Sequence, residues 1–261
     1  MSIYTICVSN QKGGVGKTTT AVNLAAGLAM RGCRTLMIDM DPQANATSGL
    51  GLDPRRIRRG VYQSILGTAE PSTVIQQSPD VEHLSILPAT QDLLGVEVEM
   101  VNAVSREQRL KECIDRVKDD YDFAVIDCPP SLGLLTLNAL TAASSALIPL
   151  QCEYYALEGL SQLTSTVDLV RRAFNPRLNI EGILLTMFDR RNNLCHQVAA
   201  DARQHFPEAV FDVTIPRNVR LSESPSFGKP IYLYDRASKG AKAYERLADH
   251  LARKHMKGPL K

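Results

Sequence analysis

The sequence lacks the features of a membrane or secreted protein. No window of its 261 residues approaches the roughly 20 consecutive apolar residues that cross a bilayer. The first residues, Met1–Tyr4, lead straight into an apolar run with no basic region and no cleavage site, so we expect no signal peptide. These absences predict a soluble, cytoplasmic protein.

Paired cysteines are also missing. The six cysteines are scattered and form no C-x-x-C pair, which argues against a zinc site and against a disulfide framework. We expect them to be small buried residues in a reducing compartment, although Cys128 directly follows a motif described below. They are Cys7, Cys33, Cys113, Cys128, Cys152 and Cys195.

No Pro-, Gly- or Ser-rich linker and no low-complexity run divides the chain. With 44% hydrophobic residues it can bury a substantial core, and we expect a single domain over residues 1–261. Charge is uneven within it: residues 217–261 contain eleven Lys or Arg against four Asp or Glu, whereas residues 1–216 contain 19 against 24. The basic C-terminal portion, with its short tail at 255–261, suggests a basic face for a polyanion.

Apolar runs alternate with helical stretches along the chain. The apolar runs show no strict polar alternation, which is typical of parallel strands buried between helices. The sequence therefore predicts an α/β fold, a mostly parallel twisted sheet with helices on both faces and ligands beyond the carboxyl ends of the strands. The predicted strands cover residues 3–9, 34–41, 84–89, 121–130, 144–152, 180–188 and 209–216, and the predicted helices 19–32, 105–118, 133–143, 157–174, 192–205 and 238–254.

The stretch NQKGGVGKTTT (residues 10–20) joins the first predicted strand to the first predicted helix. Its glycines allow a tight turn that brings backbone N–H groups close to an anion. In the G-x-x-x-x-G-K-[ST] pattern, Lys17 reaches the β- and γ-phosphates and Thr18 binds Mg²⁺. We expect nucleotide contacts from Gly13, Gly14, Val15, Gly16, Lys17, Thr18 and Thr19.

The loop departs from this pattern at its start. The position of the first glycine is occupied by Gln11, and an extra lysine, Lys12, follows. A loop that already has Lys17 thus carries a second cation, which needs a role of its own.

Two further segments place carboxylates at strand ends. In FAVIDCPP (123–130), four apolar residues lead to Asp127, a candidate for the magnesium shell that we expect to act through water. In IDMDPQANATSGLG (38–51), Asp39 and Asp41 face the same way at i and i+2. Asp41 is placed to orient the attacking water, and Asp39 either joins the magnesium shell or bonds the phosphate-loop backbone. The alternative is that all three acids only cap turns or face solvent.

These motifs resemble a known family. KGGVGKTTT with Lys12 is the deviant Walker A loop, and with DMDPQ and VIDCPPSLG it is similar to the ParA/Soj chromosome and plasmid partitioning ATPases of the MinD/ParA superfamily. QCEYYALEGL (151–160) and IPRNVRLSESPSFGKPI (215–231) look like later signatures of that family, so the resemblance runs from Ile3 to about Leu251. It implies a single P-loop NTPase domain with weak, Mg²⁺-dependent ATPase activity.

The resemblance also implies a dimer. In this family two ATP-bound protomers pack face to face, and the signature lysine, here Lys12, crosses to the partner's triphosphate. That role would resemble an arginine finger, so Lys12, Lys17 and Asp41 are the expected catalytic residues. The adenine is expected to rest against Pro216 and Asn218.

The resemblance further implies that the ATP dimer binds double-stranded DNA without sequence preference and is nucleoid-associated. A ParB-like centromere-binding protein would stimulate hydrolysis and release it. Larger relatives carry an N-terminal helix-turn-helix domain; we expect none here, since there is no room before residue 3, and hence no operator-specific repression. The candidate DNA-binding residues are Arg191 and Arg220 first, then Arg190, Lys229, Lys239, Lys242 and Arg246.

Several alternatives stay open. A nucleoid-based ATPase that positions chemotaxis clusters or carboxysomes would share this chemistry, and a DNA-coating scaffold would need little hydrolysis. A MinD-like membrane role is disfavoured because the C-terminal end has few bulky apolar residues, and an iron–sulfur role because Cys128 has no evident second thiolate. The cluster RRIRR (55–59) reads as an exposed basic turn.

Overall fold

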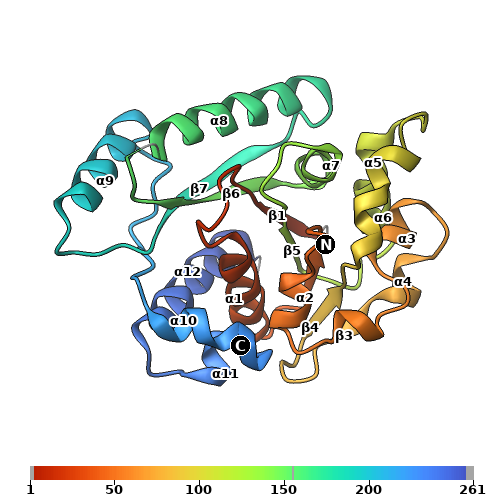
Figure 1. The fold of residues 1–261 in the computed structure, drawn as a ribbon, viewed down its shortest axis with the longest axis horizontal. Coiled ribbons are helices and arrows are strands. Elements are labelled where there is room, and N and C mark those ends of the chain that lie inside the picture. The colour runs from red at the N-terminus through yellow and green to blue at the C-terminus, as the bar shows by residue number, and fades with distance from the viewer. Residues whose placement is uncertain (1–2, 155, 257–261) are drawn as a thin grey trace.

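A seven-stranded sheet forms the centre of the protein (Figure 1) in the computed structural model, which describes residues 3–154 and 156–256. Its strands are β1 (Tyr4–Val8), β2 (Thr35–Asp39), β3 (Gln76–Gln77), β4 (Leu84–Leu87), β5 (Phe123–Asp127), β6 (Ser145–Gln151) and β7 (Asn179–Thr186). The order is β3-β4-β2-β5-β1-β6-β7, and among these described strands only the β3–β4 pair is antiparallel. The mostly parallel sheet is confirmed, and the carboxyl ends of β1, β2 and β5 meet at its middle.

Helices cover both faces of the sheet, as Figure 1 shows. One face carries α1 (Lys17–Ala29), α2 (Asn45–Gly49), α10 (Val219–Glu223), α11 (Ile231–Tyr234) and α12 (Lys239–His255). The other carries α3 (Val61–Ile65), α4 (Pro71–Val74), α5 (Val96–Glu99), α6 (Arg109–Asp115), α7 (Leu134–Ala142), α8 (Ala156–Ala173) and α9 (Asn193–His205).

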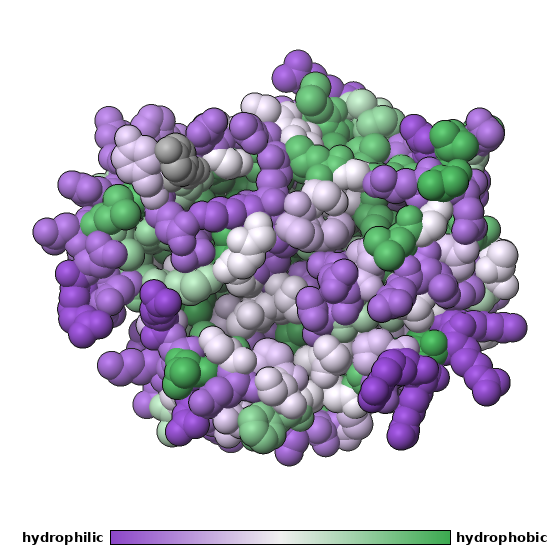
Figure 2. Space-filling view, viewed as in Figure 1, coloured by the Kyte–Doolittle hydropathy of each residue, from purple (hydrophilic) through white to green (hydrophobic). Residues whose placement is uncertain are grey.

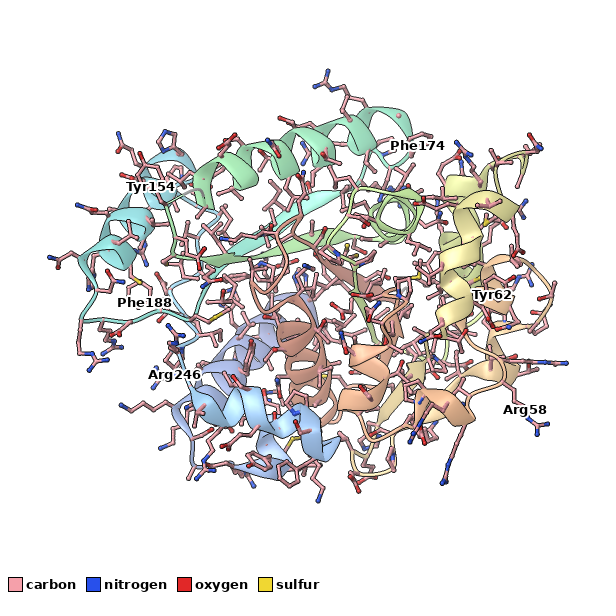
Figure 3. All side chains as sticks on the ribbon, viewed as in Figure 1. Arg58, Tyr62, Tyr154, Phe174, Phe188 and Arg246 are labelled. Atoms are coloured by element: carbon pink, nitrogen blue, oxygen red, sulfur yellow. The ribbon has the colours of Figure 1, made fainter. Side chains whose placement is uncertain are left out.

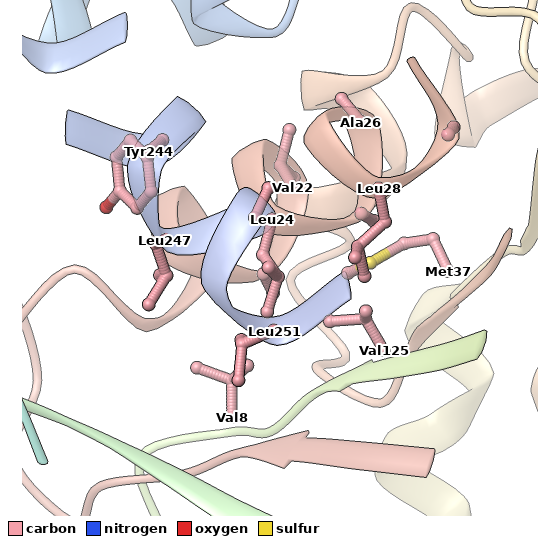
Figure 4. Packing of buried hydrophobic residues seen from close by; sticks show 14 of the residues in the cluster. Val8, Val22, Leu24, Ala26, Leu28, Met37, Val125, Tyr244, Leu247 and Leu251 are labelled. Atoms are coloured by element: carbon pink, nitrogen blue, oxygen red, sulfur yellow. The ribbon is translucent and has the colours of Figure 1, made fainter. Parts of the chain in front are cut away.

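Successive side chains along a strand point alternately into the hydrophobic cores on the two faces of the sheet. In β5, Val125 belongs to the core under α1 and α12, whereas Ala124 and Ile126 belong to the core under α6 and α7, as the period of two in a strand requires. Helices α1 and α12 approach closely at Gly27, where an added Cβ would lie 2.8 Å from the Cβ of Ala248. Figure 4 shows this contact region, with Leu24 and Leu28 of α1 near Leu247, Leu251, Val8 and Val125.

The long elements follow the predictions closely, and the errors concern one strand and several short pieces. The predicted strand 209–216 is wrong: this segment forms only two isolated bridges, Ile183 with Val210 and Phe188 with Pro216. Predicted helix 105–118 is shorter, because it consists of a 3-10 turn and then α6. The short helices α2 to α5, α10 and α11 and strand β3 were not predicted, since pieces this short carry little periodicity.

The described part of the chain contains no helix that is both long and apolar enough to cross a membrane. The predicted tail begins at the end of α12, and its residues 257–261 lie outside the described residues.

A buried carboxylate fixes the last turn of α12 against the sheet. Glu181, on β7, has a side chain that is only 1% exposed and bonds Lys254 Nζ at 2.8 Å and His255 Nε2 at 2.9 Å. It also accepts hydrogen bonds from Tyr4 Oη at 2.8 Å and Ser145 Oγ at 2.6 Å. Burial alone would raise the pKa of Glu181, but the hydrogen bonds from His255, Lys254 and Ser145 outweigh it and hold the pKa well below its usual range.

We predict that Glu181→Gln lowers the free energy of unfolding by about 2 kcal/mol at pH 7, because it removes the buried charge that Lys254 and His255 share. Since the folded pKa is depressed, the stabilisation is complete above the unfolded pKa of 4.5 and is lost as the pH falls below it. Chemical denaturation from pH 7 to pH 3 measures both effects. The exposed Glu208→Gln is the matched control, and an equal loss in both variants would contradict the role of the buried network.

Candidate functional site

The phosphate loop lies between the central strand β1 and helix α1. Gly14 and Gly16 have φ angles of 76° and 87°, which other residues rarely adopt. Gly16 is the N-cap of α1, and no side chain of residues 3–154 or 156–256 caps the helix, so the N–H groups of its first turn are available to an anion. A Cβ added at Gly13 or Gly14 would meet nothing within 4 Å, so this side of the loop is open.

The side chains of the two lysines in the loop, Lys12 and Lys17, have different surroundings. Lys17 is 7% exposed and its Nζ donates to the backbone oxygen of Lys12 at 3.0 Å. Burial lowers the pKa of Lys17, and the charges of Asp127 and Asp41 act in the opposite sense. The side chain of Lys12 instead pairs with Glu153 and is 45% exposed. Lys12 therefore holds the loop through its backbone while its charge lies outside the cleft of its own chain.

Asp127 lies at the end of β5, directly beneath the loop. It is fully buried, and neither of its oxygens has a hydrogen-bond partner of ordinary geometry in the described part of the chain. Burial raises the pKa of Asp127, as do Asp39 and Asp41, whereas the nearby Thr18 and Lys17 lower it. A buried carboxylate with two unpartnered oxygens beside Thr18 fits a magnesium ion or its water shell.

The two aspartates of DMDPQ have separate surroundings. Asp39 is paired in register with Asp127 on the neighbouring strand, and burial raises its pKa to about 6. Its oxygens accept from Thr47 N at 2.8 Å, Thr47 Oγ1 at 2.7 Å and Asp41 N at 3.1 Å. These bonds go to the segment after β2, so Asp39 does not bond the phosphate-loop backbone, and its place in a magnesium shell stays a prediction. Asp41 is 8% exposed, accepts from Gln43 N at 2.9 Å and lines the cleft.

A cleft of about 840 Å³ brings most of the predicted nucleotide residues together. Of the predicted residues, Val15 is buried beneath the cleft, where its carbonyl accepts from Thr186 Oγ1 at 2.8 Å. The predicted residues that line it are Gly13, Gly14, Gly16, Lys17, Thr18, Thr19, Asp41, Pro216 and Asn218. The predictions missed Gln43, Asn45, Thr186, Met187, Arg217 and Tyr244.

Signals for some of the missed residues exist in the sequence. Gln43 and Asn45 lie in the same stretch as Asp41, and Arg217 lies between Pro216 and Asn218. Tyr244 gave no such signal, because it reaches the cleft from α12, late in the chain.

A second cavity, of about 730 Å³, gathers basic side chains from α12 and from the loop after β7. We call it the basic pocket; the charged residues that line it are Arg190, Arg191, Arg217, Lys239, Lys242, Arg246 and Asp189. Figure 3 shows Phe188 and Arg246 close together at this edge, and Figure 2 shows that hydrophilic residues cover most of it. Five of the seven predicted DNA-binding residues thus lie together.

The other two candidates lie elsewhere. Arg220 bonds Glu223 at 2.9 Å and Asp235 at 3.4 Å, and Lys229 lines a small cavity of about 230 Å³ beside Thr18 and Asn45. Within the RRIRR cluster, Arg55 and Arg56 pair with Asp53 and are 89% exposed.

The cysteines are buried and unpaired. The sulfurs of Cys7 and Cys128 lie 3.2 Å apart, but both side chains are fully buried in the core, so neither has access to a second protomer. Within residues 3–154 and 156–256, no group of three or more His, Cys, Asp or Glu side chains is arranged to hold a metal. Mg²⁺ does not need such a group, since it is commonly bound through one or two carboxylates, waters and substrate phosphates.

A phosphate loop between a central strand and a helix, with acids at the ends of neighbouring parallel strands, defines a P-loop nucleotide-binding protein. A family model described as an AAA domain matches residues 3–180. The chromosome partitioning protein ParA of Myxococcus xanthus is 57% identical over 249 residues, which cover 95% of this chain and 88% of the relative. The sporulation initiation inhibitor protein Soj of Bacillus subtilis is 55% identical over 247 residues, covering 95% and 97%.

Solved structures agree with the fold. The crystal structure of cobyrinic acid a,c-diamide synthase from Mycobacterium smegmatis, with a bound ATP analogue and magnesium, is 37% identical and has a TM-score of 0.86 over 99% of this chain and 98% of that chain. The chain belongs to the ParA/Soj family of partitioning ATPases.

Proposed function

We propose that this protein is a Mg²⁺-dependent ATPase that dimerises when it binds ATP, binds double-stranded DNA without sequence preference and segregates DNA together with a ParB-like centromere-binding partner. The observation that carries the proposal is the cleft in which Lys17, Thr18 and Asp41 meet above the unpartnered carboxylate of Asp127. Membership of the ParA/Soj family supports the partitioning role.

Each of these residues would have its own role in binding or hydrolysing ATP. The loop N–H groups and Lys17 would hold the phosphates. Thr18 and Asp127 would hold magnesium, which supplies neutralisation of the phosphate charge when it is bound. Asp41 would orient and polarise the attacking water.

Dimerisation is supported by the position of Lys12. Its amino group lies outside its own cleft and pairs with Glu153 at the surface. An exposed ion pair of this kind contributes only about 0.2–1 kcal/mol, so little free energy opposes the transfer of Lys12 to a partner's triphosphate. Hydrolysis would then depend on assembly.

DNA binding is supported by the basic pocket. Six basic side chains surround a single carboxylate there, and a surface of this kind suits a phosphate backbone rather than base edges.

We predict that Arg191→Glu lowers the affinity for a random-sequence duplex by roughly tenfold at physiological salt, because it replaces a phosphate-binding charge with a repulsive one. Arg191 is 90% exposed and, among the described residues, pairs only with Asp189, so ATP-driven dimerisation should stay intact. Fluorescence anisotropy measures the first effect and light scattering the second.

The matched control is Arg58→Glu, the same charge reversal at the edge of the molecule opposite Arg246 of the basic pocket (Figure 3). Equal losses of DNA affinity in both variants would show that the effect comes from the overall charge of the protein and not from the basic pocket. Unchanged binding in Arg191→Glu would move the DNA surface elsewhere.

A further inference from the structure

The nucleotide cleft and the basic pocket share one wall. Pro216 and Arg217 line both cavities. They belong to the segment 215–217, which runs beside the end of β7: Ile215 N donates to Leu185 O at 2.8 Å, Phe188 N to Ile215 O at 2.9 Å and Arg217 N to Phe188 O at 3.4 Å. These backbone bonds tie the shared wall to the loop that carries Arg190 and Arg191.

The opposite wall of the basic pocket is also connected to the nucleotide site. Helix α12 presents Lys239, Lys242 and Arg246 to the pocket. The same helix presents Tyr244 to the nucleotide cleft, where its hydroxyl lies 3.0 Å from Thr20 Oγ1 of α1. Both walls of the basic pocket therefore rest on elements that contact the nucleotide cleft.

Arg217 differs from the neighbouring arginines in its partners. Arg191 makes two side-chain bonds to Asp189, both of 3.1 Å, and Arg220 pairs with Glu223 and Asp235. In the described part of the chain, the guanidinium of Arg217 has no hydrogen bond and no ion pair within 4 Å, although its charge helps to lower the pKa of Asp189. Arg217 is exposed, so a phosphate oxygen would displace no partner from it.

We propose that Arg217 binds a backbone phosphate of DNA in the basic pocket, and that segment 215–217 couples nucleotide occupancy to the affinity of that pocket for DNA. The inference rests on the proposed function and adds to it a DNA-binding residue, Arg217, and a segment that connects the two sites. A nucleotide against Pro216 fixes the backbone of Arg217, and the bonds to Phe188 extend this order to Arg190 and Arg191. Because coupling between two sites is reciprocal, DNA must tighten nucleotide binding by the same factor.

The test uses the full chain, a 30-base-pair random duplex and ATPγS. For wild type and Arg217→Ala, DNA affinity is measured with and without ATPγS, and ATPγS affinity with and without DNA. We expect Arg217→Ala to weaken DNA binding by roughly tenfold, to reduce the salt slope by about one and to bring the ratio of DNA affinities with and without ATPγS closer to one. Arg217→Lys keeps the charge and should recover part of the affinity.

The control is Arg203→Ala, which removes an exposed arginine of α9 that does not line the pocket. DNA affinity in Arg217→Ala that matches that of Arg203→Ala overturns the phosphate contact. An unchanged ratio of DNA affinities overturns the coupling. If wild type binds no DNA even with ATPγS, the proposed function itself fails, and this result is distinct from the other two.

Discussion

Asp41→Ala is expected to lower ATP turnover by about 10²- to 10⁴-fold, the usual contribution of a positioned acid or base. Asp41 is 8% exposed and lines the cleft together with the residues of the phosphate loop. ATP binding should persist, because the loop and Lys17 are untouched, and the variant should accumulate as an ATP dimer on DNA. Single-turnover hydrolysis and nucleotide titration separate the two steps.

Asp41→Asn distinguishes the catalytic role of the Asp41 charge from its structural role as a hydrogen-bond acceptor. Asparagine keeps an oxygen that can accept from Gln43 N, the bond of 2.9 Å that orders the start of this segment, but it loses the negative charge. We expect it to be as inactive as Asp41→Ala. Normal turnover in Asp41→Asn would assign Asp41 a role in shaping the loop and would remove it from the reaction.

Lys12→Ala is expected to reduce turnover by at least about 10²-fold, since a cation supplied by a second subunit is worth about 10³ to 10⁵ in kcat when it is an arginine. Glu153→Gln is the matched control, because it removes the negative charge that pairs with Lys12 in this structure and keeps the lysine. We expect that variant to retain turnover.

Mixing two inactive variants tests whether Lys12 acts in the other subunit. In a mixed dimer of Lys12→Ala and Asp41→Ala, one of the two sites combines an intact Asp41 with an intact Lys12 from the partner. The mixture should therefore recover roughly a quarter of wild-type turnover if the dimers form at random. No recovery, with mixed dimers verified by differential tagging, would show that both residues serve the site of their own chain.

The positions of the strands were predictable where the local sequence pattern was strong. The strands β1, β2, β5 and β6 were predicted because each is a mostly apolar run without strict polar alternation, which is how a strand buried on both faces appears in a sequence. The 209–216 segment has a similar composition, yet it forms only isolated bridges with β7 and its neighbouring loop. Composition does not reveal whether a partner continues the ladder, because pairing depends on distant residues.

The candidate site also has features that the sequence predicts and features that depend on tertiary packing. The phosphate loop was predictable from the sequence alone, since the spacing of glycine, lysine and threonine matches a phosphate-binding turn. The three acids were predictable because each follows an apolar run at the end of a strand. The sequence also indicated, through Lys12, a cation without a use in its own loop.

The sequence did not predict which acid has free oxygens or which cations lie together, because both depend on how distant segments pack. Asp39 and Asp127 look alike in the sequence, but the oxygens of Asp39 accept hydrogen bonds from Thr47 and Asp41, whereas those of Asp127 have no hydrogen-bond partner of ordinary geometry among the described residues. Likewise, Arg217 and Lys242 meet in one pocket only because α12 packs beside the end of β7. Side chains from distant segments become neighbours through packing, and local sequence patterns carry no record of such contacts.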